Sequence, residues 1–225
     1  MSNDFVNGVI RSSIKYKMPH IPSALSLYYL ESIFPYISKD WNIVLGKPHG
    51  AQAYYYYFEK FFRQKPKQYL SVIETDFYDF IDYCDVTIGN ALGIAIGLSY
   101  NNKPTWVNIS DAALQTGSTL ESIQFIGKNQ TDILLTVDYN NIQLTEDFMG
   151  LDIIEQEKIF INYGWETLIV FDKADYLAIE NFMNKIGPKV ILFNTKKGKG
   201  VKEMEENPIE WHYKILKDIN EITII

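Results

Sequence analysis

The chain of 225 residues is long enough for one large α/β domain or two small ones. Hydrophobic residues make up 47%, which is ample for a buried core, and the net charge of −7 argues against a general role in nucleic-acid binding. The single cysteine, Cys84, excludes an internal disulfide and fits a reducing compartment. Residues 1–7 are polar and no long apolar run follows, so we expect no signal peptide, no membrane span and a cytoplasmic location.

Hydrophobic spacing and turn residues predict helices and strands that alternate along the chain. This alternation favours a single α/β domain over residues 1–225, with a parallel sheet covered by helices on both faces. The predicted helices are Phe5–Lys17, Ala24–Ile37, Ala51–Phe62, Gly89–Gly97, Leu120–Lys128, Asp152–Tyr163 and Tyr176–Lys185. The predicted strands are Trp41–Leu45, Thr105–Ile109, Ile133–Asp138, Glu166–Phe171 and Lys189–Asn194.

Two of these helices carry features with more than one explanation. Residues 54–58 are four tyrosines and a phenylalanine, which cannot all face one core from a helix. The rings either pack around that helix or meet a partner surface. Gly89, Gly93 and Gly97 recur every four residues, although glycine destabilises helices. Close approach of a ligand or another backbone would explain this stripe, and helix–helix packing explains it equally well.

Asp111 and Asn140 follow two predicted strands that are about one βαβ unit apart. If these strands are parallel neighbours, both side chains lie at the carboxyl edge of the sheet, where open α/β sheets bind ligands. Their oxygens and a nearby backbone carbonyl suit Mg²⁺, and the N-terminus of the following helix suits an anion. This spacing indicates a magnesium diphosphate site, although Asp and Asn also end strands or cap helices without a ligand.

An ordered set of motifs resembles the N-terminal half of transketolases, in the form encoded as a separate subunit. It covers nearly the whole chain. The motifs, in chain order, are HIPSALS from His20, KPH from Lys47, the helix from Gly89, SDA from Ser110, VDYNNIQ from Val137, NYGWE from Asn162, TKKGKGV from Thr195, ME at Met204, NP at Asn207 and WH at Trp211.

This resemblance implies a thiamine-diphosphate-binding fold of the diphosphate-binding type, with thiamine diphosphate and Mg²⁺ or Ca²⁺ as cofactors. His20 and His49 would be catalytic and would face the thiazolium ring and the substrate. Asp111 and Asn140 would ligate the metal through their side chains, and Ile142 through its carbonyl. The residues expected at the cofactor are Gly89, Asn90, Ser110, Asp111, Ala112, Asn140 and Ile142.

The chain departs from the family pattern at several positions. Ser110 and Ala112 replace both glycines of G-D-G, and Pro48 replaces the glycine before His49. Ala174 stands where the family has a substrate histidine. These departures imply that substrate handling is altered more than cofactor handling.

Residues near the C-terminal end are expected to be structural. His212 belongs to a segment that we expect to lie outside the site. Lys196, Lys197 and Lys199 form a basic turn that we expect to bind the domain's own acids or a partner.

The resemblance implies a transketolase-like transferase subunit that moves a two-carbon ketol unit from a ketose-type donor to an aldehyde acceptor. It also implies activity only with a separately encoded pyrimidine-binding subunit, in a heterotetramer. One alternative is a 2-oxo acid decarboxylase/carboligase subunit, favoured by the lost histidine at Ala174 and disfavoured by His20 and His49. Another is a degenerate, non-catalytic scaffold, favoured by the altered G-D-G turn and disfavoured by the retained Asp111 and Asn140.

Overall fold

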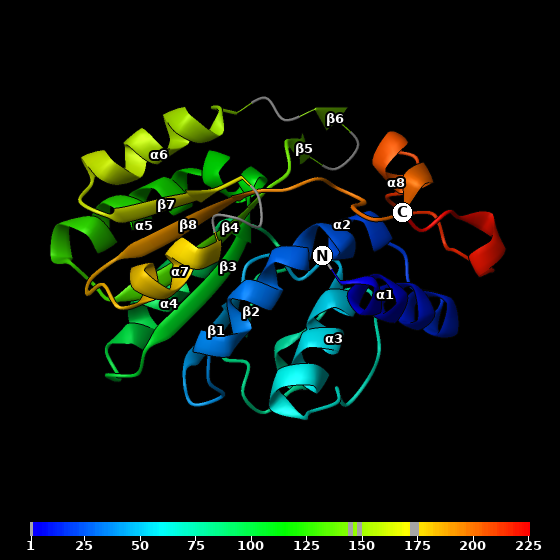
Figure 1. Ribbon diagram of the computed structural model, residues 1–225. Coiled ribbons are helices and arrows are strands. Elements are labelled where there is room, and N and C mark those ends of the chain that lie inside the picture. Colours follow the sequence, from blue (N-terminus) through cyan, green and yellow to red (C-terminus); the bar gives the residue numbers. More distant parts are fainter. Residues whose placement is uncertain (1, 144–145, 148–149, 172–175) are drawn as a thin grey trace.

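A parallel sheet of six strands forms the centre of the protein (Figure 1). The computed structural model describes residues 2–143, 146–147, 150–171 and 176–225. The strands of this sheet are β1 (Asn42–Leu45), β2 (Tyr83–Cys84), β3 (Thr105–Ser110), β4 (Ile133–Tyr139), β7 (Glu166–Val170) and β8 (Lys189–Asn194). They are ordered β2-β1-β3-β4-β8-β7, and each neighbouring pair is parallel. A separate antiparallel pair is formed by β5 (Ile142–Gln143) and β6 (Glu146–Asp147).

Helices connect the strands and confirm most of the predicted pattern. The α-helices are α1 (Asn3–Tyr16), α2 (Ile21–Leu25), α3 (Ala51–Phe62), α4 (Ala91–Ser99), α5 (Gly117–Asn129), α6 (Ile153–Asn162), α7 (Tyr176–Met183) and α8 (Lys202–Glu206). Short 3₁₀ turns are η1 (Ser26–Ser32), η2 (Phe34–Tyr36), η3 (Thr75–Phe77), η4 (Asp111–Gln115) and η6 (Ile219–Glu221). No helix in the described part of the chain is long and apolar enough to cross a bilayer.

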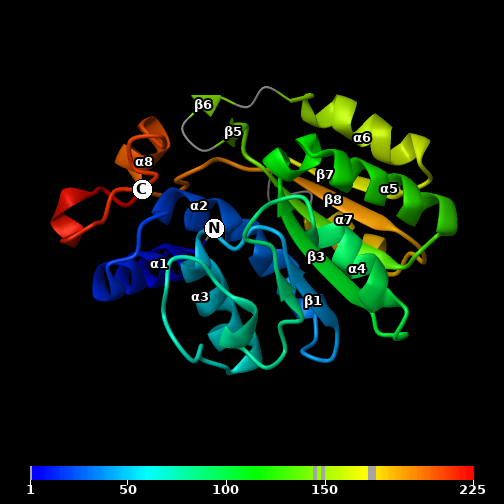
Figure 2. The same cartoon turned by 180° about the vertical axis from the view of Figure 1, so that it is seen from behind.

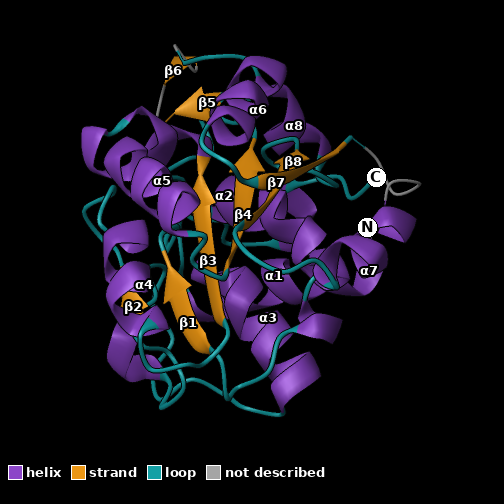
Figure 3. Ribbon diagram, turned by 90° about the vertical axis from the view of Figure 1, so that its left-hand side faces the viewer, coloured by secondary structure: helices purple, strands orange, loops and turns teal. Residues whose placement is uncertain are grey.

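The sheet separates two layers of helices. Figure 3 shows α4, α5 and α6 on one side of the sheet and α1, α3 and α7 on the other. Successive strand residues point to opposite faces, so Val107 and Ile109 pack with the α4–α6 layer while Trp106 packs with the α1–α3 layer. Both faces are therefore apolar, as expected for a parallel sheet that is covered on both sides.

The predicted long helix over 24–37 is instead α2 followed by the 3₁₀ turns η1 and η2. The hydroxyl of Ser26 donates to the carbonyl of Ser23 at 2.9 Å and to the carboxylate of Asp138 at 2.7 Å. Such side-chain bonds compete with helical ones. Pro35 also lacks the N–H that a longer helix would need.

The tyrosine-rich stretch of α3 packs inside the protein itself. Tyr54, Tyr55 and Tyr57 are buried, and Tyr56 is half-buried. The helix is enclosed on two sides, because Tyr57 stacks on Phe5 of α1 and the hydroxyl of Tyr55 donates to the carbonyl of Leu70 in the loop after α3. Internal packing accounts for these rings, and a partner surface is not required to explain them.

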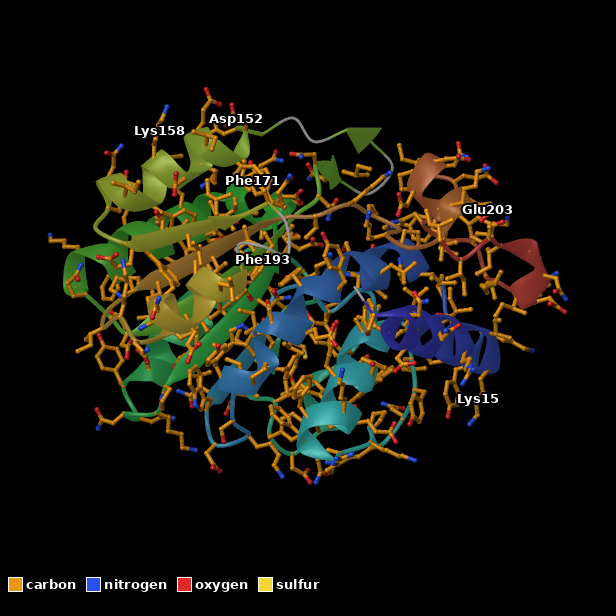
Figure 4. The ribbon with its side chains drawn as sticks, viewed as in Figure 1. Lys15, Asp152, Lys158, Phe171, Phe193 and Glu203 are labelled. Atoms are coloured by element: carbon orange, nitrogen blue, oxygen red, sulfur yellow. The ribbon has the colours of Figure 1, made fainter. Side chains whose placement is uncertain are left out.

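The C-terminal segment returns to the first helices. The N–H of Gly198 donates to the carbonyl of Pro22 at 3.0 Å, and the N–H of His20 donates to the carbonyl of His212 at 3.0 Å. Glu203 of α8, labelled in Figure 4, accepts the N–H of Thr223 at 2.8 Å. Residues 195–225 are thus tied to α2 beside the carboxyl edge of the sheet (Figure 1).

Candidate cofactor site

The carboxyl ends of β3 and β4 bring Asp111 and Asn140 together. The two strands pair in parallel with Ser110 opposite Asp138, so both chains leave the sheet at the same level. The Oδ2 atom of Asp111 accepts the backbone N–H groups of Asn140 at 3.0 Å and Asn141 at 2.8 Å, and its Oδ1 accepts the N–H of Ala112 at 2.8 Å. This contact confirms the predicted neighbouring strands.

A cavity of about 370 Å³ opens at this edge. Most of the residues that the sequence nominates line it: His20, His49, Ser110, Asp111, Ala112, Asn140 and Ile142. Gly89 and Asn90 do not, although their neighbour Ile88 does.

The backbone N–H groups at the N-terminus of α4 are already bound by a side chain of the protein itself. The buried carboxylate of Asp85 accepts the N–H groups of Asn90 at 2.6 Å and Ala91 at 3.1 Å. A Cβ atom at Gly89, which has a φ of +98°, would lie 2.8 Å from side-chain oxygens of Thr116 and Ser118. Close packing of α4 on α5 therefore explains this glycine.

The three histidines of the chain gather in the cavity. The ring of His20 lies 5.2 Å from that of His49 and 4.9 Å from that of His212, and Tyr213 packs edge-on against both His20 and His212. The sequence prediction for His212 was wrong, because the C-terminal segment folds back over α2 and brings this side chain to the cavity. The sequence signal for His212 was the place of Trp211-His212 in the ordered set of family-like motifs.

These histidines are held in their neutral forms near neutral pH. Burial lowers the pKa of His20 to about 4, with help from His49 and Lys197. Burial and the nearby cations lower the pKa of His212 to about 3, and burial also lowers the pKa of His49. The Nδ1 atoms of His20 and His212 have no hydrogen-bond partner among the described residues. A neutral imidazole can accept a hydrogen bond or a proton from a bound ligand at one ring nitrogen and can donate a hydrogen bond to it from the other.

Two buried lysines bring positive charge to the same cavity. Lys47 pairs with the buried carboxylate of Asp138, and Lys197 is only 4% exposed. Burial lowers the pKa of Lys197 to about 8, and Asp111 opposes that shift. Lys196 and Lys199 instead bind Glu205, at 2.6 and 3.8 Å. The expectation that the basic turn binds the domain's own acids thus holds for these two, whereas Lys197 of the same turn lines the cavity near Asp111.

The oxygen atoms at this edge fit a divalent cation that carries a diphosphate. Among the described residues, no three His, Cys, Asp or Glu side chains gather as a metal-binding group. The edge offers the carboxylate of Asp111, the amide oxygen of Asn140 and backbone carbonyls such as that of Ile142. Mg²⁺ and Ca²⁺ accept such oxygen ligands, and Mg²⁺ commonly completes its shell with phosphate oxygens. Burial raises the pKa of Asp111, while backbone N–H donors and Lys47 favour its ionised form.

One nominated departure falls outside this description. Ala174, at the position of a family histidine, lies outside the described residues. Thr116, near the turn after Asp111, caps α5 by accepting the N–H of Thr119 at 3.4 Å.

Comparison with curated proteins gives 1-deoxy-D-xylulose-5-phosphate synthases and transketolases. The chain is 26% identical over 169 residues to the 1-deoxy-D-xylulose-5-phosphate synthase of Blochmanniella floridana, covering 59% of this chain and 27% of that protein. It is 27% identical over 146 residues to one subunit of the apulose-4-phosphate transketolase of Actinobacillus succinogenes, covering 58% and 51%. The chain thus matches between about a quarter and a half of the length of these relatives. No protein-family model matches it.

Solved structures give the same fold. The transketolase from Leishmania mexicana superposes with a TM-score of 0.70 at 18% identity, covering 89% of this chain and 37% of that one. The chain therefore has the parallel α/β fold of thiamine-diphosphate-binding domains. With its curated relatives, it is identified as a relative of the N-terminal segment of transketolase-family proteins.

Proposed function

We propose that the chain is a diphosphate-binding subunit of a transketolase-like enzyme, which holds thiamine diphosphate and a divalent cation at the carboxyl edge of its sheet. The observation that carries this proposal is the convergence of Asp111, Asn140, Ile142 and Lys197 on one cavity with three neutral histidines. Asp111, Asn140 and Ile142 would hold the cation, and Ser110 and Ala112 leave room for the diphosphate beside them.

The reaction best supported is transfer of a two-carbon ketol unit between a ketose-type donor and an aldehyde. Thiamine diphosphate, when bound, supplies the nucleophilic carbon for this chemistry. The residues of this chain would bind and orient the cofactor and the substrate. His20, His49 and His212 would donate hydrogen bonds to substrate oxygens and move protons there, because their low pKa values leave them neutral.

A partner chain is part of the proposal. The relative from Actinobacillus succinogenes is named as one subunit of its enzyme. Four large apolar side chains are exposed on the outer face of α4 and α5, beside polar residues of α5: Ile94, Tyr100, Leu120 and Phe125 are between 37% and 74% exposed. Figure 2 shows the two helices side by side in the outer layer. Val86 and Ile88 extend this face to the rim of the cavity. We propose that a pyrimidine-binding chain covers it in a cytoplasmic heterotetramer.

Decarboxylation of a 2-oxo acid followed by carboligation is the second candidate. One curated relative is named as a synthase of a phosphorylated ketose rather than as a transketolase. Trapping the cofactor adduct after mixing the two-chain enzyme with pyruvate or with a ketose phosphate separates the two by mass.

Titration calorimetry tests the binding proposal. We expect thiamine diphosphate to bind in the presence of Mg²⁺, weakly to the chain alone and more tightly with its partner chain. Asp111→Asn preserves the shape of the side chain but removes its charge, and should weaken binding by about 100-fold. Asp152→Asn, at the exposed cap of α6, is the matched control and should bind normally. Absence of heat for the wild-type complex would exclude the proposal. If Asp111→Ala left the activity of the partner enzyme intact, the result would favour a non-catalytic scaffold role for this chain.

A further inference from the structure

The most deeply buried acid beside the cavity is Asp138, at the second-last position of β4. It is 0% exposed, and four side chains from four separate segments donate to it. The Oδ2 atom accepts from Ser26 at 2.7 Å, from Asn140 at 2.9 Å and from Lys47, and the Oδ1 atom accepts from Thr195. Lys47 also donates to the hydroxyl of Ser26 at 2.9 Å. This set of contacts joins the ends of β1, β4 and β8 to the start of η1.

One of these contacts decides which way the amide of Asn140 points. Its Nδ2 atom donates to Asp138, and its Oδ1 atom accepts the N–H of Ile142 at 3.1 Å. Because an ionised carboxylate only accepts hydrogen bonds, the amide cannot turn its oxygen toward Asp138. The oxygen of Asn140 is therefore kept on the side of Ile142, which also lines the cavity.

Stability alone does not explain this buried pair. Removing two charges from water is costly, and well-packed apolar residues often replace a buried ion pair without loss of stability. An apolar side chain is buried directly beside this position, since Phe193 of β8 is the register partner of Asp138 and lies in the core. A polar residue at position 138 thus needs another reason.

We infer that Asp138, charge-balanced by Lys47, is a positioning residue that presents the amide oxygen of Asn140 to the bound cation. The inference rests on the proposed cofactor site and adds the outer contacts that orient one of its ligands. Groups that hydrogen-bond to metal ligands typically contribute 10- to 100-fold in metal affinity. Ser26 and Thr195 fill the remaining acceptor positions of the carboxylate, while its two other partners, Asn140 and Lys47, both line the cavity.

Binding of Mn²⁺, a hard ion that also accepts oxygen ligands, tests the inference. Free Mn²⁺ is measured by electron paramagnetic resonance on the full chain in the presence of thiamine diphosphate. The double variant Asp138→Val/Lys47→Met removes both charges together and leaves Asn140 without its acceptor. We expect Mn²⁺ affinity to fall 10- to 100-fold, with the folded structure retained by circular dichroism.

Three further variants separate positioning from packing. Asp138→Asn keeps Lys47 in place and keeps an acceptor oxygen for the amide of Asn140, and should bind Mn²⁺ within about threefold of wild type. Asn140→Asp, added to the Asp138→Val/Lys47→Met pair, should restore affinity because a carboxylate presents an oxygen in either orientation. Lys189→Met removes a buried lysine at the opposite end of the sheet and should leave Mn²⁺ affinity unchanged.

The outcomes distinguish this inference from the proposed function. Wild-type affinity in Asp138→Val/Lys47→Met would overturn the inference while leaving the cofactor site in place. A 10- to 100-fold loss of Mn²⁺ affinity in Asp138→Asn would also overturn it, and this variant decides the matter even where the valine variant does not fold. Lack of Mn²⁺ binding by the wild-type chain would remove the proposed site and the inference together.

Discussion

Asp111 accepts the backbone N–H of Asn140 at 3.0 Å, although 29 positions separate the two residues. Because β3 and β4 are parallel neighbours, this bond links the two segments that leave the carboxyl ends of these strands. The carboxylate is held by three N–H groups in total and needs no other side chain to stay in place. The edge is thus pre-formed for a ligand, which lowers the entropic cost of binding.

Lys197 should contribute directly to diphosphate affinity. We expect Lys197→Met to weaken thiamine diphosphate binding about tenfold, since hydrogen bonds to charged groups are worth about 1.5–3 kcal/mol. Lys199→Met, from the same turn but paired at the surface with Glu205, is the control and should have little effect. Calorimetry of both variants in the same buffer measures the difference, and equal losses would argue against a specific role for Lys197.

The same lysine predicts a pH dependence. The pKa of Lys197 is lowered to about 8, so its ammonium group loses its proton as the pH rises through that value. Diphosphate affinity should therefore be greatest below pH 8 and decline between pH 8 and 9. In Lys197→Met this decline should be smaller, and an unchanged pH profile would contradict the assignment.

Acid should destabilise the chain through its buried histidines. The pKa of His20 is about 4 in the folded chain, below the usual value of about 6.5, so folding favours the neutral ring. The stability that depends on this neutral form is complete above pH 6.5 and is lost as the pH falls toward 4. We expect a loss of about 1 kcal/mol at pH 5 from this group, because solvent in the cavity screens part of the full effect.

His20→Asn isolates that effect. The backbone of His20 is left-handed, with a φ of +63°, and asparagine tolerates this region better than most residues. Urea unfolding at pH 5 and 7 should show a smaller difference for His20→Asn than for wild type. A difference as large as that of wild type would mean that other groups carry the acid sensitivity.

The exposed face of α4 should respond to side-chain size in two opposite ways. Apart from the adjacent residues and the backbone of its own helix, no described atom lies within 4 Å of a Cβ placed on Gly97. Gly97→Ala should therefore stabilise the isolated chain by about 0.5–1 kcal/mol, through helix propensity. Gly97→Leu should weaken association with a pyrimidine-binding partner chain, measured by sedimentation of the mixture. Lys158→Leu, on the outer face of α6 (Figure 4), is the control. If Gly97→Leu and Lys158→Leu associated equally well with the partner chain, the interface would not include the exposed face of α4.

Elements with strong local signals were predictable from sequence. The bounds of α3 agree with the prediction, and α6 begins directly after its N-cap Asp152, whose side chain forms a capping box with Glu155. The long strands agree to within two residues because their apolar runs are bounded by polar turns. The edge strand β2 was missed, since only Tyr83 and Cys84 pair and such a short run has no periodicity.

Features that depend on long-range contacts were not predictable. His212 and Lys197 reach the cavity because the C-terminal segment bonds to α2, and neither hydrophobic spacing nor turn residues indicate that return. The glycine stripe also has mixed causes. Gly89 packs on α5, whereas Gly97 faces open space, so one spacing pattern conceals two environments.

The central claim is that the ends of β3 and β4 hold a divalent cation with a diphosphate. Anomalous X-ray diffraction from crystals grown with Mn²⁺ and thiamine diphosphate tests it most directly. The account predicts one strong manganese peak within ligand distance of the carboxylate of Asp111, the amide oxygen of Asn140 and the carbonyl of Ile142. Cofactor density with its manganese bound away from these three oxygens would contradict it.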